Sequence, residues 1–249
     1  MGVPSRANTE FLSALKFAEQ LLILDAAYTD PPLAADVATV AALRGGAAVL
    51  MVAAFEKFLH DLIHDGFSSL SGVPPAVPMS SVPVAIGHHS VSQSFRRADR
   101  ATVYGVSRTE TDRYQGLVAA AQRAVADRLD PDSFADTGSN PGPDRMGQMF
   151  KDGGIPDIFT VVRPSFDAIW KKPEAVHFVR DKLDEIVQRR HRVAHAADVL
   201  AISRVDLLDA VRFLQALAAA LDTLFDGHLV HLGGVGSPMA SVPIAPPPP

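Results

Sequence analysis

The sequence predicts an all-α protein, a bundle of helices with a proline-rich insertion between two of them. Two observations support this fold class. Apolar residues recur at three- and four-residue spacing over most of the chain, and clusters of proline and glycine separate these segments. Hydrophobic residues make up 47% of the 249 residues, which is ample material for a core.

The first two predicted helices cover residues 8–28 and 33–67. Asn8 or Thr9 is available as the N-terminal cap of the first. In the second, apolar residues recur at helical spacing on both sides of Gly45-Gly46. Because a glycine in a helix interior costs about 1 kcal/mol relative to alanine, this pair predicts either a kink or a close helix crossing.

Residues 68–110 read as a loop-rich insertion, because prolines stand among small residues there and no helical period continues. Residues 111–129 predict another helix, and a turn-rich passage leads into a short helix over residues 144–151. The apolar stripe of the 111–129 helix consists of Tyr114, Leu117, Val118, Ala121 and Val125.

The C-terminal third predicts two long helices, over residues 173–197 and from Ser203, as cap, to residue 225. Gly227 is expected to end the second. Because the connection is short, the two helices are expected to pack antiparallel. The domain organisation is then an N-terminal helix (1–32), a helical domain (33–228) and a disordered proline-rich tail (229–249).

Charge and composition exclude several classes of protein. A formal net charge of −5 argues against non-specific coating of nucleic acid, which relies on many cationic contacts. The absence of cysteine excludes disulfides, thiolate nucleophiles and cysteine-ligated zinc. No uninterrupted apolar run reaches about 18 residues and the N-terminus lacks a secretory layout, so we expect a cytoplasmic protein without membrane contact.

The strongest candidate for chemistry is Arg190-His191-Arg192-Val193-Ala194-His195, near the end of a predicted helix. His191 and His195 are four residues apart and share one helical face, and Arg190 lies about 100° around the axis from His191. A guanidinium grips phosphate oxygens, and an imidazole exchanges protons near neutral pH. These groups are suited to cleaving a phosphodiester without a metal or other cofactor.

Two other interpretations fit the same spacing. Cationic residues in the last turns of a helix offset the helix dipole and often have only that role. A His-x-x-x-His pair is also a zinc geometry, although Arg192 follows His191 where a zinc protease has glutamate. We therefore assign no metal ligands. Loops for phosphate binding in P-loop enzymes and the Gly-x-Ser-x-Gly turn of serine hydrolases are absent from the sequence.

The motif and its context resemble the HEPN domains (higher eukaryotes and prokaryotes nucleotide-binding), whose signature is arginine followed after four to six residues by histidine. Arg190, His191 and His195 match that signature. The segment around Glu56 resembles the helix that packs across from the motif. The passages Gly138-Ser139-Asn140-Pro141 and 149–155 resemble the RiboL-PSP branch. His191 departs from the pattern, because asparagine or aspartate is frequent there.

The resemblance implies a HEPN-like helical bundle and a metal-independent endoribonuclease of toxin-antitoxin, abortive-infection or anti-phage systems. It implies that Arg190 stabilises the phosphate, that His195 acts as general base or acid and that His191 assists. It also implies RNA as substrate, a homodimer with a composite site, and an antitoxin or defence-system component as a further partner. Arg189 and Arg192 flank the motif, and either an RNA contact or a solvated position fits them.

Two alternatives to this function stay open. One is a non-catalytic HEPN module that binds RNA, nucleotide or a protein partner, and the other is a structural helical protein whose motif is coincidental. Glu56 either pairs with Arg190 across the helices or is a surface carboxylate. His88-His89 and the cluster Phe95-Arg96-Arg97 with Arg100 are weaker candidates for substrate contact. His228 and His231 are expected to decorate the end of the last helix.

Overall fold

The computed structural model of the chain describes residues 4–72, 76–103, 105–138, 141–196 and 202–234. In these residues eight α-helices account for nearly all regular structure, which confirms the all-α fold class. Their bounds are α1 (Arg6–Asp25), α2 (Val37–Gly72), α3 (Val84–Asp99), α4 (Glu110–Val125), α5 (Pro143–Asp152), α6 (Ile158–Trp170), α7 (Phe178–Ala196) and α8 (Arg204–Gly234). The minor elements are the 3-10 helices η1 (Met79–Ser81) and η2 (Pro131–Ser133) and the antiparallel strands β1 (Thr102–Val103) and β2 (Val106–Ser107).

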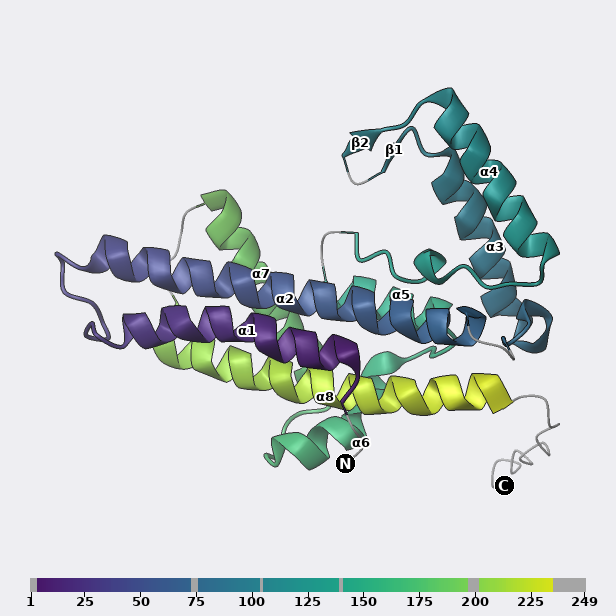
Figure 1. Cartoon of the computed structure of the whole chain (residues 1–249). Coiled ribbons are helices and arrows are strands. Elements are labelled where there is room, and N and C mark those ends of the chain that lie inside the picture. Colours follow the sequence, from purple (N-terminus) through teal and green to yellow (C-terminus); the bar gives the residue numbers. More distant parts are fainter. Residues whose placement is uncertain (1–3, 73–75, 104, 139–140, 197–201, 235–249) are drawn as a thin grey trace, which may run out of the picture.

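Three long helices, α1, α2 and α8, lie side by side and form the body of the bundle (Figure 1). Their buried faces share one apolar core, so the N-terminal helix is part of the same packed body. At Gly66 of α2 an added Cβ would lie 2.5 Å from the Phe225 ring of α8. Glycine at this position therefore lets α2 and α8 approach closely.

Helix α1 begins earlier than predicted, at Arg6, and its N-terminal cap is Ser5. The Ser5 hydroxyl accepts a hydrogen bond from the Asn8 amide at 3.1 Å. The prediction of Asn8 or Thr9 as cap was wrong because Asn8 is buried in the first turn, where its side-chain amide donates to Asp222. The apolar period identified the helix but not its first turn.

Helix α2 runs without interruption through Gly45-Gly46, which settles the choice in favour of a close crossing. A Cβ at Gly46 would lie 3.0 Å from a Leu21 methyl group of α1. Among the described residues, α2 is long and apolar enough to cross a membrane by length and composition. The same properties suit a core helix, and α2 is in contact with α1, α7 and α8.

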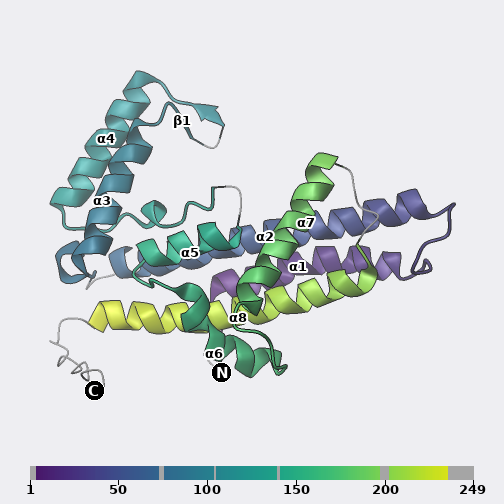
Figure 2. The same cartoon turned by 180° about the vertical axis from the view of Figure 1, so that it is seen from behind.

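The segment predicted as a loop-rich insertion contains helix α3, so that prediction was wrong for residues 84–99. Helix α3, the hairpin and α4 form an arm that projects from the bundle (Figures 1 and 2). In the hairpin, Gly105 has φ +76°, a conformation that glycine adopts without strain. The α4 stripe is largely exposed (Tyr114 68%, Val125 88%), because α4 packs chiefly on α3.

The C-terminal third differs from prediction in its helix boundaries and packing. Helix α6 was not predicted, and α7 begins at Phe178 instead of residue 173. Helix α8 is capped at Ser203 as predicted, since the Ser203 hydroxyl accepts from the Asp206 amide at 3.1 Å. It continues through Gly227 to Gly234, and residues 235–249 of the predicted tail lie outside the described residues.

Helix α7 does not pack antiparallel along α8. It packs mainly on α2, while α6 covers the neighbouring face of α8. Figure 2 shows that α7 crosses α2 and that its C-terminal end stands clear of the bundle. The short connection to α8 therefore joins two crossing helices.

Candidate functional site

Helix α7 carries the basic motif and is held in place by one apolar face. Val179, Leu183, Ile186 and Val187 are buried on that face, at the three- and four-residue spacing of an amphipathic helix. Asp181 lies in the first turn, where the helix dipole favours a negative charge. Beyond Val187 the burial decreases and, of the described side chains, only Val193 still packs against the core, so the motif lies where the helix leaves the bundle.

The motif residues differ in exposure. The Arg190 side chain is half-buried, and His191 and Arg192 are exposed. No hydrogen bond or ion pair of the Arg190 guanidinium is found in the described part of the chain. His195 belongs to α7 by its backbone, whereas its side chain lies outside the described residues. The structure therefore places the predicted site at an accessible helix end.

Arg189 has a structural role that the sequence left open. Its guanidinium is paired with Glu185 one turn earlier in α7 and lies 3.9 Å from Asp206 of α8. The side chain is only 13% exposed. Of the two arginines that flank the motif, Arg192 is thus the accessible one.

Glu56 lies on α2 and does not pair with Arg190 within the described residues. Its carboxylate accepts a hydrogen bond from the Thr137 hydroxyl at 2.8 Å. The idea of an ion pair across the helices is therefore wrong for this structure. Glu56 instead fixes the segment 136–138, which passes between α2 and α7.

A cavity of about 380 Å³ adjoins the motif helix. Asp184 and Gln188 of α7 line it together with residues 136–138 and 142–145. Positions 184, 188, 191 and 195 lie within about 60° on the same side of α7, because successive residues turn by 100°. The cavity thus lies on the helix face that the two motif histidine positions share. Helical period alone could have added Asp184 and Gln188, but it could not have identified the segment opposite.

Two further cavities continue from there toward the arm. One has a volume of about 430 Å³ and is lined by three parts of the chain. These are α2 with Glu56 and His60, α3 with Arg97 and Arg100, and the segment that ends at Gly138. The other, of about 310 Å³, has a wall made by α3 and an opposite wall made by α5 and residues 132–136. Its α3 lining consists of His89, Gln93, Arg96, Arg97 and Arg100.

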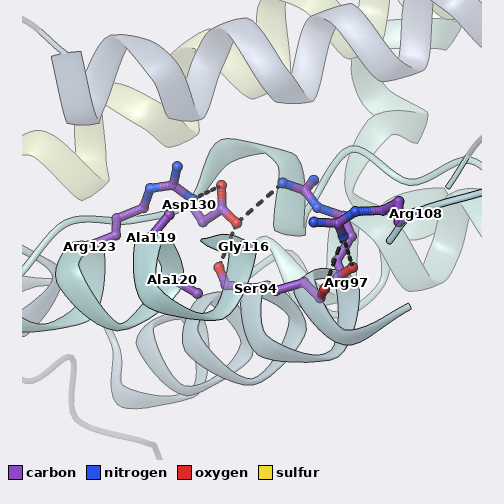
Figure 3. Close-up of a pocket in the computed structure, with 9 residues that line it drawn as sticks. Ser94, Arg97, Arg108, Gly116, Ala119, Ala120, Arg123 and Asp130 are labelled. Atoms are coloured by element: carbon purple, nitrogen blue, oxygen red, sulfur yellow. Dashed lines mark hydrogen bonds and ion pairs between the residues drawn. The ribbon is translucent and has the colours of Figure 1, made fainter. Parts of the chain in front are cut away.

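The arm is joined to the connector after α4 through Asp130, whose side chain is almost fully buried. Its carboxylate accepts from Ser94 at 2.5 Å and lies 2.7 Å from Arg123 and 3.5 Å from Arg97. Figure 3 shows these groups converging on Asp130 from α3 and α4. The adjoining 230 Å³ cavity is also lined by Arg108, which donates to the Ala98 carbonyl at 2.9 Å. This cluster fixes the orientation of α3.

The remaining histidine candidates lie on helices and have defined surroundings. His88 is exposed on α3, whereas His89 makes a 3.0 Å contact with the Ser133 carbonyl. On α8, Nε2 of His228 donates to the Gly153 carbonyl at 2.8 Å. Burial lowers the pKa of His228 below its ordinary value, and the Gly153 hydrogen bond partly opposes that shift. His89 therefore borders the groove, and His228 joins α8 to the end of α5.

Fold and site together define a helical domain that presents an Arg-His-x-x-x-His motif at a projecting helix end. The chain belongs to the RiboL-PSP-HEPN family, because the model of that family matches residues 13–227. The predicted resemblance is thereby confirmed for the fold and family. No curated protein and no solved structure matches the chain.

The passages that resemble the RiboL-PSP branch, 138–141 and 149–155, are described in part by the structure. Ser139 and Asn140 lie outside the described residues. Pro141, Gly142 and Pro143 are buried, and Pro143 begins α5. Gly153 caps the end of that helix and Gly154 follows with φ +96°. Of these residues, Gly138, Gly142 and Pro143 line the 380 Å³ cavity opposite α7, whereas 149–155 do not.

Proposed function

We propose that the protein is a metal-independent endoribonuclease of a toxin-antitoxin, abortive-infection or other anti-phage system, acting on cytoplasmic RNA. Membership of a HEPN family supports an RNA-related module. The observation that carries the proposal is the accessible helix end, where Arg190 is adjacent to His191 and precedes His195 by five residues. Arginine and histidine are the groups needed to cleave a phosphodiester by internal attack.

In the proposed reaction the ribose 2′-hydroxyl attacks the adjacent phosphorus and the bond to the 5′-oxygen breaks. A base accepts the 2′-hydroxyl proton, and an acid donates a proton to the leaving oxygen. The products are a 2′,3′-cyclic phosphate and a 5′-hydroxyl. His195 is the principal base or acid, His191 assists, and Arg190 stabilises the charge that develops on the phosphoryl oxygens.

The reaction uses two proton-transferring groups, and a second copy of the chain would supply a second motif. The C-terminal end of α7 stands clear of the bundle, which leaves room for a homodimer across this face (Figure 2). Arg192 is exposed beside the motif and is the flanking residue proposed to contact RNA phosphates. Light scattering of the purified chain is expected to give the mass of a dimer.

The test is cleavage of a labelled RNA in excess EDTA by the native chain and by Arg190→Ala and His195→Ala. We expect each substitution to lower the rate at least roughly a hundredfold, since acid–base groups contribute about 10²–10⁴-fold. Arg212→Ala, which removes an exposed arginine of α8, is the matched control. Cleavage that survives both substitutions would refute the site assignment, and RNA binding without cleavage would identify a non-catalytic HEPN module.

A further inference from the structure

The two cavities beside α3 and the one beside α7 adjoin one another. The cavities of 310 and 430 Å³ share Arg97, Arg100, Asp132 and Asp136 in their linings. The cavities of 430 and 380 Å³ share Asp136, Thr137 and Gly138. Figure 1 shows the arm and the end of α7 rising from the same side of the bundle, with α2 and α5 between them. We call this series of cavities the arm groove.

One wall of the arm groove is a polar and basic stripe on α3. His89, Gln93, Arg96 and Arg100 are spaced four, three and four residues apart, so they share one side of the helix. All four line the 310 Å³ cavity. The Phe95-Arg96-Arg97 cluster of the sequence thus forms part of a defined surface that faces the path to α7.

Arginines outnumber carboxylates only in the 310 Å³ cavity of the arm groove, whose lining includes Arg96, Arg97, Arg100 and Arg145 together with Asp132, Asp136 and Asp152. The other two cavities add the carboxylates of Glu56, Asp144 and Asp184 and no further arginine. Asp132 is paired with Arg97 at 2.5 Å, and Asp136 is paired with Arg145 at 3.5 Å. Arg100 lies 3.8 Å from Asp136, at the limit of an ion pair, and Arg96 has no ion pair among the described residues. Both side chains are exposed. These two guanidiniums can therefore accept an anion without breaking a close ion pair.

The stripe is also fixed in position before any ligand binds. Arg97, between the two exposed arginines, is paired with Asp132. Arg97 and Ser94 also both contact Asp130 (Figure 3). A Cβ at Gly116 would lie 2.7 Å from Arg108 and 3.3 Å from Ala98, so α4 packs tightly on this part of α3. Because the helix that carries them is held in place, Arg96 and Arg100 project from fixed backbone positions one turn apart, which lowers the entropic cost of binding successive phosphates.

We propose that single-stranded RNA acted on by the motif of α7 is anchored at the α3 end of the arm groove, with Arg96 and Arg100 contacting its backbone phosphates. This inference rests on the proposed ribonuclease function. Single-stranded nucleic acid is bound where cationic side chains line a groove, as they do at the α3 end of this one, and arginine is suited to phosphate because it presents a planar fork of donors. The groove ends beside Gln188, about 5–10 Å along α7 from positions 191 and 195.

The test measures binding of a fluorescein-labelled single-stranded RNA of about 20 nucleotides by anisotropy over a range of salt concentrations. Arg190→Ala is used as the background so that the RNA stays intact. Adding Arg96→Ala and Arg100→Ala should weaken binding roughly tenfold. The slope of log affinity against log salt should fall by about 0.7 per lost contact. The control pair, Arg128→Ala with Arg212→Ala, removes the same charge from exposed positions outside the groove.

An equal loss in the control pair, or an unchanged salt slope in the groove pair, would overturn the proposal. The experiment distinguishes a failure of the groove assignment from a failure of the proposed ribonuclease function. If the native chain cleaves RNA while the groove pair binds and cleaves normally, the groove assignment fails and the ribonuclease stands. If the native chain binds RNA through Arg96 and Arg100 without cleaving it, the ribonuclease fails and the groove stands.

Discussion

Asp25 at the end of α1 and Arg44 on α2 form an ion pair of 3.1 Å, with side chains 0% and 5% exposed. Arg204 at the start of α8 lies 2.6 Å from the same carboxylate. Arg44 also donates to the carbonyl of Ile202, seven residues after His195. This charge cluster thus ties three helices to the residues that follow the motif helix.

Replacing Arg44 by alanine is expected to lower the free energy of unfolding by about 3 kcal/mol, because it removes one partner of a buried carboxylate. Urea denaturation measures the change. Arg6→Ala, which breaks an ion pair between Arg6 and Asp65 on the surface, is the control and should have a much smaller effect. Equal changes in the two variants would show that burial adds nothing to the Asp25–Arg44 pair.

Two glycines in long helices should respond to alanine in opposite directions. At Gly66 the new Cβ would lie 2.5 Å from Phe225 and 2.7 Å from Leu229, and such overpacking costs about 1–3 kcal/mol. At Gly227 nothing lies within 4 Å, so alanine should stabilise α8 by about 0.5–1 kcal/mol. Thermal unfolding of both variants checks the signs, and a stabilised Gly66→Ala would contradict the close packing of α2 on α8.

The pH dependence of stability should carry a contribution from His228. Because burial lowers its pKa in the folded protein, the unfolded chain binds this proton more readily. The contribution of neutral His228 to the free energy of unfolding is therefore fully present above the ordinary histidine pKa of about 6.5. It decreases as the pH falls through and below that value. The melting temperature of His228→Gln between about pH 7 and 5 should decrease less steeply than that of the native chain.

His88→Gln is the control for this measurement, because His88 is exposed on α3. Its melting curve should follow that of the native chain across the same range. Parallel curves for the native chain and His228→Gln would exclude His228 as the source of the pH dependence.

Asp130→Ala should loosen the arm from the connector, because it removes the acceptor shared by Ser94, Arg97 and Arg123. Hydrogen exchange followed by mass spectrometry should become faster in residues 84–125, with little change in the core of α2 and α8. Asp99→Ala, which breaks the exposed contact with Arg113, is the control. Unchanged exchange in the arm would mean that α3 and α4 hold their position without Asp130.

The sequence predicted the helical core and the site motif because both depend on local spacing. Leu183, Ile186 and Val187 repeat at helical intervals, and so do His191 and His195. In the arm, α4 was predicted but α3 was missed, because few apolar residues of α3 are buried, Ile86 and Ala98 among them. The groove was missed because its walls come from α3, α5 and α7, which are far apart in the chain.

One wrong prediction and one open alternative are both decided by tertiary contacts. Gly227 looks like a helix terminator, but α8 continues because Leu232 is buried beyond it. Pairing of Glu56 with Arg190 was left open, and in the structure Glu56 accepts from the Thr137 hydroxyl instead. In both cases a partner distant in sequence decides the outcome, and local pattern contains no information about that partner.

Because the chain contains no cysteine, spectroscopic labels can be attached to the projecting arm at introduced cysteines alone. Gly105 is a poor position for an introduced cysteine, because a residue with a side chain is strained at this positive φ. The neighbouring Val106 is exposed and is suitable. A second thiol at the exposed Phe17 of α1 would complete a donor–acceptor pair without any background labelling. The separation of arm and bundle would then become a distance that can be followed in solution, one molecule at a time.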